Sequence, residues 1–127
     1  MSYESVYIGT ELKFLIEIEA DNFSMVDDNF TVDIVRGLNR QHFEKSDLVD
    51  EEYQEEDADH NTVTKHHYYV CFDTATLGAG TVYAIVTAYV PDMDFSDGLR
   101  TEVYKVELGK LIEVEAFKTS YGIIARG

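Results

Sequence analysis

The chain has 127 residues, of which 25 are Asp or Glu and 10 are Lys or Arg, and its formal net charge is −15. Such a charge disfavours binding to nucleic-acid phosphates and to anionic membrane surfaces, and a single cysteine, Cys71, excludes an internal disulfide. No run approaches the roughly 18 apolar residues that a membrane-spanning helix needs. The first ten residues show no signal-peptide pattern and no linker divides the chain, so we expect one domain over residues 1–117 and a tail over residues 118–127.

Alternation of apolar and polar residues predicts strands in the first third of the chain. Residues 6–8 form a short apolar run that ends at a Gly-Thr turn. Residues 12–19 and residues 30–35 each place apolar side chains at every second position, as half-buried strands do. The link over residues 21–29 is rich in Asp, Asn and Ser, so we expect it to be irregular.

Two later segments, residues 68–72 and residues 82–90, are apolar on both faces. Strands of that kind are usually central in a sheet and covered on both sides. Gly78 and Gly80 lie between the two segments and favour a tight corner there.

The last third of the chain continues the β pattern. Residues 91–98 are rich in Asp and end in an Asp-Gly dipeptide, which predicts a loop. A strand over residues 99–108 and a last strand over residues 111–117 follow, separated by Gly109. Seven or eight strands with turn signals at short, regular spacing predict an all-β, antiparallel sandwich or barrel.

The same alternation identifies the residues expected in the core. They are Phe14, Ile16, Val32, Ile34, Val70, Phe72, Val86 and Val106. Cys71 is expected to be a small buried hydrophobe rather than a nucleophile, because nothing near it in this acidic sequence would activate a thiol. Tyrosines within strands are expected to pack in the core or across strands rather than to form a sugar-binding platform.

Residues 44–65 fit the strand pattern poorly. Residues 46–57 are the best helical candidate, although their apolar face is weak. A structureless loop of this length is unusual, so the segment is either an exposed functional loop or a hairpin that the pattern does not resolve. Residues 47–59 carry eight carboxylates and no basic residue. Three interpretations stay open for this acidic run: a solvated loop, a docking site for a basic partner, and a cation site.

The sequence carries no recognisable catalytic or metal-binding motif. The loop over residues 92–98 lacks the Gly and the Glu that an EF-hand requires at fixed positions, so a turn between strands is the better interpretation. His66 and His67 are adjacent and point to opposite faces of a strand, and His60 with a neighbouring Asp would bind a metal only weakly. We therefore expect no enzymatic activity, no cofactor and no metal site.

Two segments are candidate protein interfaces. The first is the acidic run, with Asp50, Glu51, Glu52, Glu55 and Glu56. The second is the tail, in which Tyr121, Ile123 and Ile124 form a cluster that is apolar for a free terminus. This tail either folds back on its own domain or covers a neighbouring molecule.

Several segments together resemble a known group of proteins. They are residues 11–16, the link over residues 21–30, residues 68–74, residues 77–80, and the stretch from Tyr89 to Val103 that contains Pro91-Asp92 and Gly98-Leu99. The set resembles small Ig-like β-sandwich proteins encoded among the virion structural genes of tailed phages and prophages of gut Bacteroidales bacteria. It is also loosely similar to the N-terminal Ig-like domains of phage baseplate proteins. The resemblance covers about residues 5–115.

This resemblance implies an Ig-like sandwich and a role as a virion structural protein, in capsid decoration or as a tail, fibre or baseplate adaptor. Its expected partners are other virion proteins and copies of itself, with no nucleic acid and no membrane, and its expected location is the virion after synthesis in the host cytoplasm. The alternative is an Ig-like surface module that binds carbohydrate or calcium.

Overall fold

Eight β-strands and one turn of 3₁₀-helix make up the computed structural model, which describes residues 5–114. In chain order they are β1 (Ser5–Tyr7), β2 (Glu11–Ile16), β3 (Asn29–Arg36), β4 (Asn39–Glu44), η1 (Lys45–Asp47), β5 (Val49–Glu56), β6 (Thr62–Asp73), β7 (Gly80–Pro91) and β8 (Leu99–Ile112). The predicted all-β class and the predicted number of strands are confirmed.

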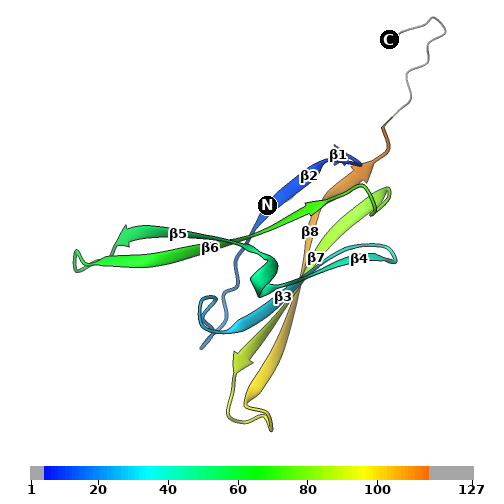
Figure 1. Cartoon of the computed structure of the whole chain (residues 1–127). Coiled ribbons are helices and arrows are strands. Elements are labelled where there is room, and N and C mark those ends of the chain that lie inside the picture. Colours follow the sequence, from blue (N-terminus) through cyan, green and yellow to red (C-terminus); the bar gives the residue numbers. More distant parts are fainter. Residues whose placement is uncertain (1–4, 115–127) are drawn as a thin grey trace, which may run out of the picture.

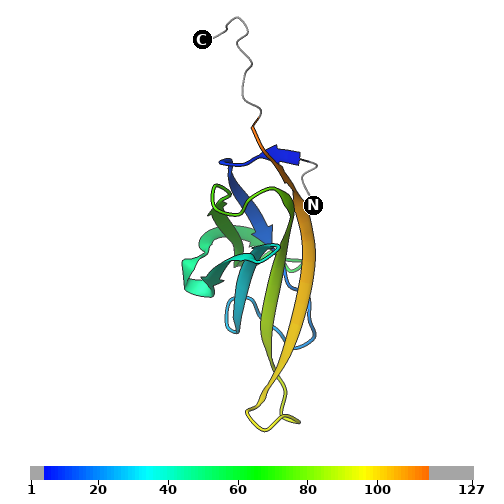
Figure 2. The same ribbon diagram turned by 90° about the vertical axis from the view of Figure 1, so that its right-hand side faces the viewer.

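The strands form two sheets, with the orders β1-β8-β7-β3-β4 and β2-β6-β5 (Figures 1 and 2). Neighbouring strands are antiparallel, except that β1 runs parallel to β8. In the lettering of Ig sandwiches, β2-β6-β5 corresponds to strands B, E and D, and β8-β7-β3-β4 to strands G, F, C and C′. The chain is therefore an Ig-like sandwich. Among residues 5–114, no strand extends the sheet beyond B at the position of strand A, and the short β1 lies on the other sheet.

The core lies between the two sheets. Seven of the eight residues predicted for it are no more than 8% exposed: Phe14, Ile16, Val32, Ile34, Val70, Phe72 and Val86. Phe14 and Phe72 are diagonal neighbours across the β2–β6 ladder, and their rings stack with centroids 5.9 Å apart. Phe30 is fully buried and contacts the ring of Tyr68 edge-on at 5.7 Å. Aromatic pairs of this kind add to the stabilisation from buried area.

The prediction that Val106 lies in the core is wrong, because this side chain is 45% exposed. Val106 pairs with the buried Ala84, so it does lie on the face of β8 that looks toward the other sheet. Its exposure arises because no strand among residues 5–114 covers that part of the face.

The expected break at Gly109 is also wrong. Strand β8 continues through this glycine, and the pairing with β7 shifts there by one residue, which leaves Leu108 as the extra residue of a β-bulge. The bulge keeps both Leu108 and Leu111 buried. Of the separate strand expected over residues 111–117, only residues 111–114 belong to the described chain.

Residues 44–65 form a hairpin rather than a helix or a long loop, so the helical candidate over residues 46–57 is wrong. Only Lys45–Asp47 are helical, and β5 then pairs along its whole length with residues 62–69 of β6. Asp57 accepts hydrogen bonds from the backbone N–H groups of Asp59 and Asn61, which closes the turn. The backbone ladder accounts for the strand, since its side chains are nearly all exposed.

Two expectations about burial are corrected by the register of the sheets. Cys71 is exposed, because it pairs with Lys13 on the outer face of the sheet while its neighbours Val70 and Phe72 point inward. Strands β6 and β7 are central, as predicted, but the outward side chains of β7 are only half-buried. Their apolar character therefore does not reflect a second covering layer within the described chain.

Candidate functional site

One side of the sandwich is left open along the line where strand A would lie. Among the strands of residues 5–114, β2 lies at the edge of its sheet and pairs with β6. On the facing sheet, β1 pairs with residues 110–112 of β8, and residues 99–109 have no strand partner on that side within the described chain. We call the strip between β2 and residues 99–109 the open seam. The β8 border is the kind of strand edge to which a further strand can add.

The top of the open seam is closed by β1. Val6 of β1 lies with Leu12 of β2 and Leu108 of β8 around a void of only about 10 Å³. The turn that joins β1 to β2 is held by Thr74, whose hydroxyl accepts a hydrogen bond from the Gly9 N–H and donates one to the Thr10 carbonyl, both at 2.8 Å. Packing and hydrogen bonds thus fix the upper end of the seam.

Below β1 the open seam is a groove of about 200 Å³ with a mixed polar and apolar lining. It is lined by Phe14, Leu15, Ile16, Glu17, Ala84, Val106 and Leu108. Val106 and Leu15 are 45% and 40% exposed, which is high for apolar side chains at the margin of a core. Leu15 points to the outer face of its sheet, because it alternates with the buried Phe14 and Ile16, whereas Val106 faces the other sheet.

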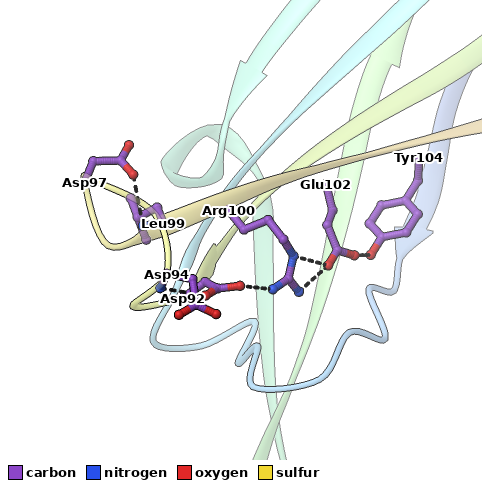
Figure 3. Close-up of polar contacts among 7 residues, drawn as sticks. All are labelled: Asp92, Asp94, Asp97, Leu99, Arg100, Glu102 and Tyr104. Atoms are coloured by element: carbon purple, nitrogen blue, oxygen red, sulfur yellow. Dashed lines mark hydrogen bonds and ion pairs between the residues drawn. The ribbon is translucent and has the colours of Figure 1, made fainter.

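The lower end of the seam is polar (Figure 3). Arg100 and Glu102 lie at alternate positions on the face of β8 that carries Val106, and Tyr104 lies between Glu102 and Val106. The Arg100 guanidinium donates to Glu102 through Nη2 at 2.6 Å and through Nε at 3.1 Å, and the Tyr104 hydroxyl donates to the same carboxylate. The hydrogen bond from Tyr104 and then that from Arg100 lower the pKa of Glu102. Arg100 and Glu102 therefore stay charged and paired at the lower end of the seam.

The loop that joins β7 to β8 lies beside this polar end, as expected for residues 92–98. Asp92 pairs with Arg100 and accepts a hydrogen bond from the Asp94 N–H at 3.0 Å, and the latter contact together with Arg100 lowers the pKa of Asp92. Asp97 accepts from the Leu99 N–H at 3.1 Å (Figure 3). Asp92 and Asp97 therefore act as turn-stabilising acceptors.

The predicted acidic interface residues lie on a projecting arm (Figure 1). We call residues 49–66 the acidic hairpin, which comprises β5, its turn and the start of β6. Asp50, Glu51, Glu52, Glu55 and Glu56 all lie on β5 and are exposed. Because β5 and β2 are the opposite edges of the three-stranded sheet, the structure does not bring the acidic hairpin and the open seam together. Tyr121, Ile123 and Ile124 lie outside the described residues.

The histidines near the acidic hairpin make separate contacts. His66 and His67 point to opposite faces, as predicted: His66 Nδ1 lies 2.7 Å from Asp50, whereas His67 stacks on Tyr53 with ring centroids 4.5 Å apart. His60 Nδ1 lies 3.0 Å from Glu56, and the His60 backbone N–H donates to the Asp57 carbonyl at 3.0 Å. Within residues 5–114, His, Cys, Asp and Glu form no group of three that could hold a metal ion.

His42 lies on the outer face of the five-stranded sheet, between two carboxylates. Its Nδ1 is 2.8 Å from the buried Asp33, and its Nε2 contacts Glu44. Hydrogen bonding to Glu44 and then to Asp33 raises the pKa of His42. Arg40 lies 3.7 Å from the same Asp33, so the buried carboxylate has two basic neighbours.

A second concave surface, of about 600 Å³, lies next to η1. Its lining includes Lys45, Leu48, Asp50, His66 and Tyr68. Lys45 donates to the Val26 and Asp28 carbonyls at 2.7 and 2.8 Å, and its burial lowers its pKa. This lysine therefore ties the β2–β3 link to the sandwich.

In comparisons with known proteins, the chain matches no protein-family model, no curated protein and no solved structure. The described residues also include no helix long and apolar enough to cross a membrane.

Sequence reasoning missed the open seam and most residues that define it. The polar end could have been predicted from the sequence. Arg100, Glu102 and Tyr104 occupy alternate positions of a predicted strand, so their side chains share one face. The role of Thr74 left no local signal, since its partners lie more than 60 residues away in the sequence.

Proposed function

We propose that the protein is a non-enzymatic structural component of a phage virion, in capsid decoration or as a tail, fibre or baseplate adaptor, and that it acts through contacts with other virion proteins and copies of itself. The virion assignment depends on the sequence resemblance to Ig-like phage structural proteins. The mode of action is supported by the open seam, where residues 99–109 of β8 have no strand partner on their outer side among residues 5–114.

The open seam is the observation on which this proposal chiefly depends. Soluble proteins commonly protect a strand edge by covering it or by placing charges on it. Among residues 5–114, the edge of β8 over residues 99–109 has no second strand partner, and Val106 on that stretch is exposed and apolar. Addition of a strand at such an edge is a recurring mode of protein recognition, in which backbone hydrogen bonds give affinity and side-chain pockets give specificity.

A surface module that binds carbohydrate is the second candidate, and one observation favours it. Tyr53, His67 and Tyr69 form a row on the outer face of the three-stranded sheet, and Lys13 lies 4.3 Å above the ring of Tyr69. Sugars stack on the faces of aromatic rings. The rings of Tyr53 and His67, however, stack on each other. The row therefore offers fewer free ring faces than a flat platform would, and we rank this function second.

Mass spectrometry of purified virions from the host that carries the gene tests the proposal. We expect the protein in the particles at a copy number comparable to that of other structural proteins, retained after washing in high salt. Absence from the particles would overturn the virion assignment. Binding to a glycan array that is lost in Tyr69→Ala and retained in Tyr83→Ala, a tyrosine of the other sheet, would instead establish the second candidate.

A further inference from the structure

The concave surface next to η1 lies where the acidic hairpin leaves the sandwich (Figure 1). We call this surface the η1 hollow. Its volume of about 600 Å³ falls within the range of about 300–1,000 Å³ that is common for binding sites. Asp50, His66 and Tyr68 line it from β5 and β6, and Lys45 lines it from η1. The η1 hollow is therefore large enough to receive a side chain of another molecule.

The hydroxyl of Tyr68 is a buried polar group that faces a need for a partner. Tyr68 is only 4% exposed, and its ring contacts Phe30 edge-on and stacks with His66 at 6.1 Å. With the groups of residues 5–114 its hydroxyl makes no hydrogen bond. Buried tyrosine hydroxyls usually have a hydrogen-bond partner. Because Tyr68 lines the η1 hollow, a ligand bound there can supply that partner.

The charges near this hydroxyl favour a cation. Burial and then the negative charges of Asp50 and Asp27 raise the pKa of Tyr68, so the hydroxyl stays neutral beside two carboxylates. His66 Nδ1 lies 2.7 Å from Oδ1 of Asp50, and within the described chain Oδ2 of Asp50 has no hydrogen-bond partner. A cationic donor in the η1 hollow can therefore reach both this carboxylate and the Tyr68 hydroxyl oxygen.

The lysine of the η1 hollow does not cancel this preference. Lys45 donates to the Val26 carbonyl at 2.7 Å and to the Asp28 carbonyl at 2.8 Å, so its ammonium is directed toward the backbone of the β2–β3 link. A second carboxylate, Glu44, also lines the hollow. The formal net charge of −15 adds a long-range attraction for cations.

The inner face of the acidic hairpin extends the negative surface beyond the hollow. Asp50, Glu52 and Glu56 lie at alternate positions of β5, on the face that His66 and Tyr68 of β6 share. Alternate positions of a strand are about 7 Å apart, and side chains on one face of an extended peptide have the same spacing. The acidic face is thus longer than a single side chain and matches an extended segment with basic residues at alternate positions.

Among basic side chains, arginine suits the η1 hollow best. Its planar guanidinium carries five N–H donors, so it can donate to Asp50 and to the Tyr68 hydroxyl at the same time. It is also more weakly hydrated than an ammonium group, which favours its transfer to an interface. Its methylene stem would lie on Val26 and Leu48, the apolar side chains of the lining.

We propose that the η1 hollow binds an arginine side chain of another virion protein, whose extended basic segment lies along the inner face of the acidic hairpin. This proposal deepens the proposed function by naming the chemistry of the partner. It rests on that function only in taking the partner to be a virion protein.

The first experiment is calorimetric titration of the full chain with the end-blocked peptide Arg-Ser-Arg-Ser-Arg at about 0.15 M salt. We expect binding with a defined stoichiometry, and none when citrulline replaces each arginine, because citrulline keeps the shape and removes the charge. Asp50→Asn and Tyr68→Phe should each weaken binding about tenfold or more, since each removes a hydrogen bond to a charged group.

Glu55→Gln is the matched control for Asp50→Asn, because it removes the same charge from the opposite face of β5. We expect it to weaken binding by no more than about threefold, as exposed charges contribute little. Absence of binding by the unaltered chain, or equal effects of Asp50→Asn and Glu55→Gln, would overturn the proposal.

The second experiment compares the stability of Tyr68→Phe with that of the unaltered chain in urea. Phenylalanine keeps the ring contacts with Phe30 and His66. If the hydroxyl serves a ligand, its removal should leave the unfolding midpoint unchanged or raise it, while peptide binding is weakened. A lower midpoint would show that the hydroxyl holds the fold and would overturn its assignment to a ligand.

Spermine tests a free polyamine as the occupant. We expect it to bind more weakly than the peptide, because its amino groups lack the planar fork of arginine. Tighter binding of spermine, lost to the same extent in Tyr68→Phe, would assign the η1 hollow to a free polyamine and overturn the protein partner.

These results are separable from the test of the proposed function. If the protein is found in virions and both Tyr68→Phe and Asp50→Asn are incorporated as well as the unaltered chain, the arginine contact is wrong and the virion role stands. If the peptide binds as expected but the protein is absent from virions, the arginine site stands and the virion role is wrong.

Discussion

Replacing Thr74 by valine tests how the top of the open seam is held. Thr74 is fully buried, and its hydroxyl is the hydrogen-bonding link between the β6–β7 connection and the turn at Gly9 and Thr10. Valine has nearly the same shape, so Thr74→Val removes the two side-chain hydrogen bonds while keeping the packing. In the variant, the Thr10 carbonyl still accepts a hydrogen bond from the backbone N–H of residue 74, which lies at 3.3 Å. The Gly9 N–H loses its acceptor, because that acceptor is the Thr74 hydroxyl.

The expected cost of Thr74→Val is about 2 kcal/mol, since each hydrogen bond contributes about 1 kcal/mol net. Thr74→Ser is the matched control, because it keeps the hydroxyl and removes one buried methyl group. That loss costs about 1 kcal/mol. The valine variant should therefore be less stable than the serine variant, although valine is the more hydrophobic residue.

Urea denaturation followed by circular dichroism measures both variants against the unaltered chain. Comparable slopes of the unfolding free energy against urea would show that the same surface is exposed in each case, so that shifts in midpoint report stability. A smaller loss in Thr74→Val than in Thr74→Ser would refute the reasoning, because it would show that methyl packing rather than hydrogen bonding holds the turn.

Three other predictions concern the core, the pH dependence of stability and metal binding. Phe72→Ala should lower the free energy of unfolding by about 3–5 kcal/mol in the same assay, whereas Phe95→Ala, at a side chain 48% exposed in the β7–β8 loop, should change it by less than about 0.5 kcal/mol; equal losses would contradict the assigned core. Because the pKa of His42 is raised above 6.5 by its carboxylate neighbours, its stabilising effect is fully present below that pH and is lost as the pH rises through the raised value. The unaltered chain should thus exceed His42→Gln in stability at about pH 5.5 and match it at about pH 9; a gap that grows with pH would be the opposite of this expectation. Calorimetric titration with calcium should show little or no binding to the acidic hairpin, since its carboxylates are exposed and unconstrained; micromolar affinity with a defined stoichiometry would restore the cation-binding interpretation.

The local pattern of the sequence predicted much of the fold. Strands with one apolar face, such as β2 and β3, were identified together with their buried residues, because period-two alternation directly records which side of a strand faces the core. The loop between β7 and β8 was identified for a related reason, since Asp and Gly specify turns through their own backbone geometry.

The acidic strand β5 could not be found this way. Both of its faces are exposed, so no alternation records its conformation. The strand exists because its backbone pairs with that of β6, and a ladder of backbone hydrogen bonds is almost independent of side-chain type. For the same reason, the sequence could not show that Cys71 points outward, because a shift of register by one residue exchanges the two faces of a strand.

The candidate site depends on the arrangement of strands that are far apart in the sequence. Its acidic and apolar interface candidates were chosen from composition, and the structure places the acidic ones on the edge opposite the open seam. Val106 has the alternation of a core residue, yet it is exposed, and among residues 5–114 the first strand pairs only with residues 110–112 of β8. Alternation determines which face of a strand is apolar. Whether another part of the molecule covers that face is determined only by the order of strands in the sheets, which is a property of the tertiary structure.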